Sequence, residues 1–572
     1  MLDHLFKDYQ DPRLAKTVAV ASAVATGGAL AYYFRASVVN AAEWVLIRAQ
    51  SYGGWPAPSA YLQKGFEPVT EEIFAQELGC KTGNLPSDMQ GCFLRNGPNP
   101  QFRPTGRYHW FDGDGMLHAV RVKDGRASYC NHFVRTSRLL QEQAAGRPVF
   151  LKFGDLRGVL ALGHIFVAYL RKALGVATDK DGGGTANTAL LCHAQRLLAL
   201  HEGDLPYHLR VACDGVLDTV GRLQVRGACG KWELAFTAHP KVDPVTGECH
   251  FFGYRVDKAP FCVYGAMDAK GQLMFQAPVD IPRGIMMHDF AITEHYAIFL
   301  DVPLEFEPRA MVAGGLPFEF VDRPTRIGVV RRGPYAGGSA PEVTWFECPR
   351  FMCFHVANAW EEGGHIRLFL CKFDKFTLDL DQYQVLRKTC PEELPTLAEV
   401  RLDLKQLGKP NAKAHLPVPL HSAKYATDFP RIHEGLVGRR SRYCYAGCMA
   451  IGSSEPFFTG IMKVDLTQPG GPAPSSDPDR HVVATTTYGG RKYGGEPVFV
   501  PRKPGAAPSG GNEDDGWVVT YVTDEDTRRS TMNVYSAKDL SAVCSVALPA
   551  RVPYGFHGMW MTEDQLQSQL AA

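Results

Sequence analysis

The amino-acid sequence predicts an all-β protein. From about residue 65 onward, short runs rich in Val, Phe, Tyr and Thr recur between clusters of Gly, Pro, Asn and Asp, which is typical of strands joined by turns. The 57 Gly and 39 Pro residues agree with many turns, and long stretches of helical periodicity are scarce. The clearest strand candidates are Glu248 to Tyr254, Tyr296 to Val302, Ile366 to Cys371, Trp517 to Val522 and Ala542 to Leu548.

Length and charge narrow the class of protein. A chain of 572 residues ordinarily suggests several domains, but one closed β architecture such as a propeller can absorb several hundred residues. Hydrophobic residues make up 45% of the chain and charged residues 21%, which excludes a wholly disordered chain, a collagen and a polytopic membrane protein. The 61 Lys and Arg residues balance 60 Asp and Glu residues, so a nucleic-acid partner is not expected.

The 15 cysteines indicate neither a disulfide framework nor a structural zinc site. No C-x-x-C motif occurs, and the closest pair, Cys444 and Cys448, has no second pair nearby. Free, buried thiols in a reducing compartment are the expected state. The cysteines therefore favour an intracellular protein.

The N-terminus contains a separate apolar segment. Lys16 and Arg35 bracket 18 uncharged residues, Thr17 to Phe34, which is the lower limit for a membrane-spanning helix. The acidic residues before it do not suit a secretory signal or a transit peptide. An uncleaved membrane anchor is the favoured interpretation; a removed targeting segment and a helix lying on the protein itself stay open. We thus predict an N-terminal apolar helix within a membrane-associating segment, residues 1–55.

Two further stretches have helical and membrane-friendly character. Ala42 to Ile47 falls in a possible amphipathic helix. Leu156 to Val176 has apolar residues at helical spacing, with Arg157, Arg171 and Lys172 at its ends. This second stretch is either a soluble core helix or a helix at a lipid headgroup boundary, since basic residues flanking bulky apolar ones suit that boundary.

Four of the 19 histidines stand out as candidate metal ligands. Each follows or precedes a strand-like run and adjoins turn residues; they are His239, His288, His355 and His557. Any one alone suits a structural role, and their spacing matches no short metal motif. Only a closed architecture with a central axis would bring all four together, as a propeller does.

Longer motifs surround these histidines and occur between them. They are RNGPNP at 95–100, HWFDGDGMLHAVRV at 109–122, TAHPKVDPVTGE at 237–248, MMHDFAITEHYAIF at 286–299, FHVANAWEE at 354–362, EPVFVPR at 496–502 and VPYGFHG at 552–558. In this order they resemble the carotenoid cleavage oxygenase family, nearest to the plant-type carotenoid cleavage dioxygenases. The resemblance runs from about residue 60 to residue 560, so that residues 56–572 form the predicted oxygenase domain.

The resemblance implies a fold and a metal site. The fold is a seven-bladed β-propeller with a cap of helices and loops over an Fe(2+) ion on the axis. Matched motif by motif, the iron ligands and catalytic residues are His239, His288, His355 and His557, and the carboxylates that hydrogen bond to three of these rings are Glu202, Asp428 and Glu496. Many relatives have Glu at position 428, and Asp is one methylene shorter. We therefore expect a longer or water-bridged contact between Asp428 and His355.

Elementary coordination chemistry supports four histidine ligands with carboxylates behind them. Neutral imidazoles bind iron, and a carboxylate that accepts the distal N–H orients each ring and raises its basicity. Four ligands on a six-coordinate metal leave positions for dioxygen. The usual alternative for non-haem iron is two histidines and one carboxylate, but no carboxylate is indicated among the direct ligands here.

The function implied is oxidative cleavage of a conjugated C=C bond in a carotenoid or apocarotenoid. The two products are carbonyl compounds, and both atoms of one dioxygen molecule enter them. The expected partners are the substrate, dioxygen and a lipid surface, at a plastid or cytosolic membrane face. Three rivals remain open: a stilbene-cleaving dioxygenase, a retinoid isomerohydrolase and a non-catalytic carotenoid-binding propeller. The cleaved bond and the oligomeric state are also left open.

Overall fold

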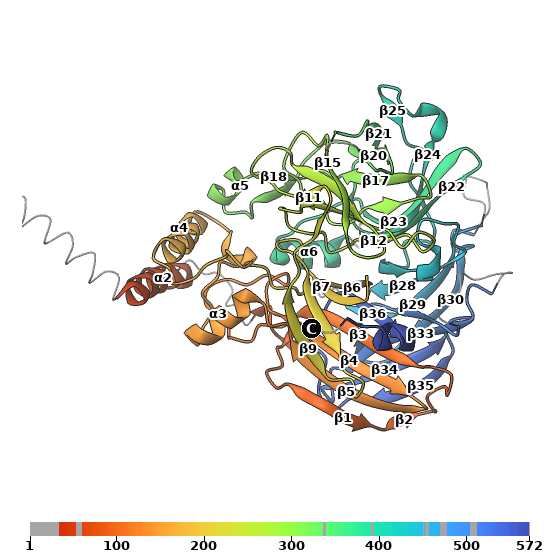
Figure 1. Ribbon diagram of the computed structural model, residues 1–572, viewed down its shortest axis with the longest axis horizontal. Coiled ribbons are helices and arrows are strands. Elements are labelled where there is room, and N and C mark those ends of the chain that lie inside the picture. Colours follow the sequence, from red (N-terminus) through yellow and green to blue (C-terminus); the bar gives the residue numbers. More distant parts are fainter. Residues whose placement is uncertain are drawn as a thin grey trace, which may run out of the picture.

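Strands dominate the computed structural model, as the sequence predicts. The structure describes residues 34–52, 60–335, 339–390, 394–449, 451, 457–468, 477–503 and 512–570. In Figure 1 the strands form the body of the molecule, and α2, α3 and α4 lie together at one side of it. The helices described are α2 (Arg35–Tyr52), α3 (Ser137–Ala145), α4 (Leu160–Ala173), α5 (Arg309–Val312), α6 (Leu380–Thr389) and α7 (Glu563–Gln567).

Four sheets follow one another along the middle of the chain. Within each sheet, strands consecutive in sequence pair mainly as antiparallel neighbours, as short turns allow. The first sheet holds β6 (Ala189–His193), β7 (Arg196–Leu200), β8 (Tyr207–Val211) and β9 (Leu217–Arg222). The second holds β12 (Lys241–Val242), β13 (Cys249–Tyr254), β14 (Cys262–Met267) and β15 (Leu273–Val279). The third holds β16 (Ala291–Ile292), β17 (Tyr296–Asp301), β20 (Thr325–Arg331), β21 (Thr344–Cys348) and β25 (Ala412–Lys413). The fourth holds β22 (Met352–Glu362), β23 (His365–Phe373), β24 (Thr396–Asp403) and β26 (Val418–Pro419).

The two ends of the chain meet in the remaining large sheets. One contains β1 (Ile73–Leu78), β5 (Arg126–Phe133), β4 (Gly115–Lys123), β3 (Gly91–Pro98) and β36 (Gly558–Thr562). The other contains β2 (Cys80–Thr82), β35 (Ala542–Ala547), β34 (Arg529–Ser536), β33 (Gly516–Asp524), β32 (Val498–Pro501), β31 (Lys492–Gly494), β30 (Val482–Thr487), β29 (Phe458–Asp465), β28 (Tyr443–Met449) and β27 (Thr427–Arg431). Late strands thus pair with early ones twice, β36 with β3 and β35 with β2. Two short pairs complete the described strands: β10 (Arg226–Gly227) with β11 (Gly230–Lys231), and β18 (Leu304–Phe306) with β19 (Phe318–Phe320).

Edge strands of these sheets surround one internal space. Residues of β6, β12, β16, β22, β27, β32 and β36 all line a cavity of about 450 Å³, which we call the central cavity. Each of these strands is the last of its sheet on one side or, for β32, pairs only with β33. All the strands that begin near the predicted histidines therefore run along a shared space.

The core lies between neighbouring sheets. Phe93 of β3 is fully buried, and its ring lies 4.6 Å from that of Tyr521 on β33. Val120, Val519 and Val534 belong to the same buried cluster, which joins the sheet of β3 to that of β33. The burial of apolar side chains between sheets holds the late strands against the early ones.

The N-terminal predictions have mixed outcomes. Residues 17–33 of the predicted apolar helix lie outside the described residues. In the part of the chain that the structure describes, no helix has the length and apolarity needed to cross a membrane. The stretch Ala42 to Ile47 does lie in a helix, α2, and the stretch 156–176 contains α4.

Helix α2 packs against α4. Glu43 pairs with Arg171 at 2.7 Å and also with Arg147. Gly163 of α4 leaves room for the side chain of Leu46, because an added Cβ would come within 2.6 Å of it. The two helices therefore form one unit, defined by complementary charge and by a close approach at a glycine.

Replacing Phe93 with Ala tests the packing between the closing sheets. We expect Phe93→Ala to lower the free energy of unfolding by about 3–5 kcal/mol, since a buried Phe is lost and a cavity is left. Phe74→Ala is the matched control, because this Phe of the neighbouring β1 is 55% exposed and such substitutions change stability by about 0.5 kcal/mol or less. Chemical denaturation measures both; equal losses would contradict the assignment.

Candidate metal centre

The four predicted histidines converge at one point. One side-chain nitrogen from each of His239, His288, His355 and His557 lies within 4.8 Å of those of the other three. The Nε2 atoms of His239 and His288 are 2.9 Å apart. The ring centroid of His355 lies 5.5 Å from that of His239 and 4.9 Å from that of His557. Sequence-distant segments thus supply a compact set of imidazole nitrogens.

The position of each histidine follows from the strands that line the central cavity. His239, His288 and His557 lie just before β12, β16 and β36, and His355 lies within β22. Residues Lys241, Val356 and Met559, each one or two positions after a histidine, line the central cavity. Three of these strands therefore begin just after a histidine, β22 contains one, and the residues that follow the histidines run along the central cavity.

A bulge sets the direction of His355. The pairing of β22 with β23 shifts register between Cys353 and Val356, on either side of His355. Bulges bend a strand and re-aim its side chains, and they are frequent next to active sites. Here Phe354 and His355, although adjacent in sequence, both line the cavity beside the histidines.

Three of the rings are oriented by the three predicted carboxylates. Nδ1 of His355 lies 2.7 Å from Oδ1 of Asp428, Nδ1 of His557 lies 2.9 Å from Oε1 of Glu496, and Nδ1 of His288 contacts Oε1 of Glu202. A carboxylate only accepts hydrogen bonds, so Nδ1 carries the proton in each pair. The Nε2 lone pair of each ring is then free to bind a metal.

The carboxylates are themselves held in place. The hydroxyl of Tyr254 donates to Oε2 of Glu202 at 2.8 Å. The backbone N–H of Gly558 donates to Oε2 of Glu496 at 2.8 Å, and that of Phe429 donates to Oδ1 of Asp428 at 2.9 Å. Each carboxylate is thus fixed by a second donor besides its histidine.

The expectation of a longer or water-bridged contact at Asp428 is wrong. At 2.7 Å its hydrogen bond to His355 is direct, and it is as short as any at the site for which a distance is given. The strand compensates for the missing methylene, because β27 shifts register between Asp428 and Arg431, and Phe429 has a φ of 54°, in the left-handed region. This irregular backbone carries the shorter side chain toward His355.

Burial and charge set the protonation of the rings. Burial and the neighbouring histidines hold the pKa of His239 well below its usual value. Burial also lowers the pKa of His557 to about 4, although Glu496 opposes the shift. Burial disfavours the charged form of His355 as well, but Asp428 outweighs it and the pKa of His355 is raised. His239 and His557 are therefore neutral near pH 7, the form that binds metals.

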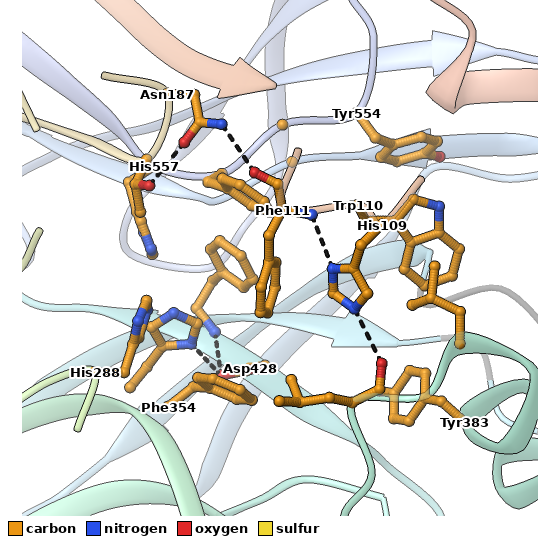
Figure 2. A pocket seen from close by; sticks show the side chains of 18 of the residues that line it. His109, Trp110, Phe111, Asn187, His288, Phe354, Tyr383, Asp428, Tyr554 and His557 are labelled. Carbon is orange, nitrogen blue, oxygen red and sulfur yellow. Dashed lines mark hydrogen bonds and ion pairs between the residues drawn. The ribbon is translucent and has the colours of Figure 1, made fainter. Parts of the chain in front are cut away.

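A cavity of about 250 Å³, which we call the aromatic cavity, opens beside the histidines. In Figure 2, His288 and His557 lie at one side of it, Trp110, Tyr554 and Tyr383 lie at the other, and Phe111 lies between them. Its other aromatic lining residues are Phe66, His109, His201, Phe354, His355, Phe373, Phe376, Phe429, Phe458 and Phe556. Most of the lining is apolar, so the space suits a long apolar molecule.

Sequence reasoning missed most of this lining. Phe354, Phe429 and Phe556 each adjoin a predicted site residue in sequence, a signal that was available. His109 belongs to the motif at 109–122; its Nε2 lies 3.0 Å from the carbonyl oxygen of Leu378, and its Nδ1 accepts the N–H of Phe111 at 3.1 Å. It thus ties two walls of the aromatic cavity together (Figure 2).

The four imidazoles fit a divalent transition metal. Three rings have Nδ1 engaged with a carboxylate, so that Nε2 is the donor atom available for a metal. Imidazole donors suit Fe, Zn, Cu and Ni. The Nε2 atoms of His239 and His288, 2.9 Å apart, are close enough to share one bound cation.

Comparisons with known proteins agree with this site. Residues 66–562 match the family model described as retinal pigment epithelial membrane protein. A carotenoid 9,10(9',10')-cleavage dioxygenase 1 of Phaseolus vulgaris is 42% identical over 521 residues, which cover 90% of this chain and 91% of that protein. A solved structure of lignostilbene dioxygenase from Pseudomonas brassicacearum superposes with a TM-score of 0.71 at 25% identity, covering 89% of this chain and 100% of that one. An apocarotenoid oxygenase of Synechocystis superposes with a TM-score of 0.68 at 26% identity, covering 88% and 99%.

The site and these likenesses define an oxygenase class built on a histidine metal centre. The chain belongs to the retinal pigment epithelial membrane protein family, which is the carotenoid cleavage oxygenase family whose motifs its sequence resembles. The predictions of a mostly β fold of this family and of a carotenoid cleavage dioxygenase with a four-histidine metal site are confirmed.

Charge removal at Asp428 tests its contact to His355. Asp428→Asn keeps an oxygen acceptor but removes the negative charge that raises the basicity of the ring. We expect the affinity for a divalent metal to fall roughly ten- to a hundredfold, as for other outer-shell partners, and Glu496→Gln to lose a similar amount. Competition with a coloured chelator measures these affinities.

Asp301→Asn is the control for this comparison. The Asp301 side chain is fully buried but pairs with Arg323 and Arg326, away from the histidines. Its substitution should lower stability and leave the metal affinity unchanged. A metal affinity of Asp428→Asn equal to that of the wild type would show that the short contact to His355 has no effect on the ring as a ligand.

Proposed function

We propose that the protein is an iron(II) dioxygenase that cleaves the 9,10 and 9',10' double bonds of a carotenoid. The single observation that carries this proposal is the convergence of four imidazole donors beside an apolar, aromatic cavity. The bond is proposed from the cleavage named for the Phaseolus vulgaris relative. Iron is proposed because imidazole suits it and because the family resemblance implies it.

Seven polar residues at the site have proposed roles. His239, His288, His355 and His557 hold the metal and are the catalytic residues. Glu202, Asp428 and Glu496 keep three of the rings in the tautomer that leaves Nε2 free, and they balance part of the metal's charge. Bound iron(II) supplies the activation of dioxygen, and the substrate's own double bond supplies the electrons that reduce it.

The aromatic cavity positions the substrate. Flat rings such as those of Phe354 and Phe429 can stack on a polyene and exclude water from it. Addition of dioxygen across one C=C bond breaks that bond, and each carbon leaves as a carbonyl that carries one oxygen atom. No additional reductant is consumed, because the four electrons needed come from the cleaved bond.

We further propose that the sheets form a seven-bladed propeller, residues 56–572, with α3, α4, α6 and nearby loops as its cap. Seven edge strands line the central cavity, which supports seven blades. The ten-stranded sheet divides naturally into two blades, because β29 and β31 are joined through the single pair Phe458 and Gly494.

Helices α2 and α4 support a proposal of membrane association. Val159, Leu162, Phe166 and Tyr169 lie at helical spacing along α4 and its N-cap, and more than half of each side chain is exposed. On α2, Trp44 and Val45 are exposed to a similar degree. We call these six residues the apolar patch. Such a patch, with Arg48 and Lys172 close by in sequence, suits a lipid headgroup boundary. Carotenoids dissolve in lipid and hardly in water, so residues 1–55 and α4 would together bring the enzyme to its substrate.

Turnover with labelled dioxygen tests the proposed reaction. The iron-loaded protein should convert a carotenoid into two end ketones and a central dialdehyde, with label from dioxygen in both halves of each broken bond. Rapid trapping before mass spectrometry is required because aldehydes exchange oxygen with water. His355→Ala should stay folded, lose the metal and form no product.

Other outcomes of this experiment point to the rivals. Label in only one half of each broken bond would indicate a monooxygenase. Isomerisation without cleavage would favour an isomerohydrolase, and cleavage of a phenolic stilbene in preference to any carotenoid would favour the stilbene-cleaving alternative.

Charged substitutions in the apolar patch test membrane association. The double variant Leu162→Asp/Phe166→Asp should lose most binding to phospholipid vesicles in a flotation assay, because each Asp must otherwise be desolvated at the headgroup boundary. The matched control is Leu416→Asp/Val483→Asp, which changes two exposed apolar residues outside the apolar patch. Equal flotation of the two variants would contradict the proposal.

A further inference from the structure

His239 differs from the other three histidines in how it is held. Within the described residues, no carboxylate hydrogen bonds to its ring, whereas the rings of His288, His355 and His557 each have one. The backbone N–H of His239 donates to Oγ1 of Thr237 at 3.0 Å, two residues away. A ligand without an orienting carboxylate must be positioned in some other way, through the backbone that carries it.

An ion pair fixes the segment that carries His239. Lys241, two residues after it, places Nζ 2.7 Å from Oδ1 of Asp289. The side chain of Asp289 is 1% exposed and that of Lys241 17% exposed. Because Asp289 directly follows His288, this one pair joins the segments of two metal ligands.

The same carboxylate reaches a third ligand segment. Oδ2 of Asp289 accepts the backbone N–H of Val356 at 2.7 Å, and Val356 directly follows His355. Oδ1 also accepts the N–H of Phe290 at 2.7 Å. Three of the four histidine segments therefore meet at the side chain of Asp289.

We propose that Lys241 and Asp289 are positioning residues of the metal centre, and that they hold His239 in place of a carboxylate. This inference rests on the proposed function, since it concerns the four-histidine site as a metal site. Removing the ammonium of Lys241 deprives the buried carboxylate of Asp289 of its ion-pair partner, which is unfavourable. It also releases the tether between the His239 segment and the segments of His288 and His355.

The pair acts from the side of the metal centre away from the substrate. Lys241 lines the central cavity, and neither Lys241 nor Asp289 lines the aromatic cavity. A substitution at Lys241 therefore changes the geometry of the ligands without altering the walls that contact a substrate. This separates a positioning effect from an effect on substrate binding.

Cobalt(II) provides a readout that does not depend on activity. The visible absorption of bound cobalt(II) reports the number and geometry of its ligands, and chelator competition reports its affinity. We expect Lys241→Met to bind cobalt(II) about tenfold more weakly, at the lower end of outer-shell effects, with a changed absorption spectrum. Lys241→Arg, which keeps the charge, should restore both properties in large part.

Lys463→Met is the matched control. Lys463 forms an equally short pair with Asp514, with Nζ and Oδ2 2.6 Å apart, and its side chain is 1% exposed. Neither residue lines the central or the aromatic cavity. This variant should lower the melting temperature at least as much as Lys241→Met and leave the cobalt(II) affinity and spectrum unchanged.

The outcomes separate the inference from the proposed function. A Lys241→Met variant with wild-type cobalt(II) affinity and spectrum overturns the inference while the metal centre stands. Equal losses of affinity in Lys241→Met and Lys463→Met also overturn it, because they reflect stability alone. Wild-type protein that binds no cobalt(II) overturns the metal centre itself. If Lys241→Met does not fold, Asp289→Asn, which keeps an acceptor for Val356, is judged by the same two readouts.

Discussion

The structure depends on holding four imidazole rings close together and correctly turned. Protonated rings at these distances would repel one another, and burial already disfavours that form at His239 and His557. Neutral rings still need orientation, because a ring that turned its N–H toward the centre would not be a ligand. Carboxylates provide it at three rings, and the rest of the fold brings those partners from distant parts of the chain.

The pairing of the last strand with an early one and the completion of the metal centre depend on the same segment. His557 immediately precedes β36, and β36 pairs with β3, a strand from the other end of the oxygenase region. The N–H of Gly558, the first residue of β36, also donates to Glu496, which orients His557. The late strand thus delivers the last histidine only when it reaches its place beside β3. A metal that binds the folded chain in turn stabilises the closed state.

The sequence was a good guide to the site residues and to the strands, because both are written in local patterns. Histidines next to strand-like runs and the seven motifs located the four rings, and all five named strand candidates overlap observed strands. The contact of Asp428 was misjudged, since it depends on a register shift and on the positive φ of Phe429 that only the paired strands impose. The union of α2 with α4 was likewise not predictable, because Glu43 and Arg171 come together only in the folded chain.

The aromatic cavity and the central cavity lie on opposite sides of the histidines and differ in what they do. Strands β12, β16 and β36 begin just after a histidine, and β22 contains His355. Residues after the histidines line the central cavity, and residues before them, such as Phe354 and Phe556, line the aromatic cavity. Apolar side chains can therefore change on one side to suit another substrate, and charged groups such as Lys241 can stay on the other. Exclusion of water from the aromatic cavity strengthens the electrostatic interactions around the histidine rings. A charged tether placed on that side would instead have to be desolvated next to the polyene, so the central cavity is the side where an ion pair costs least.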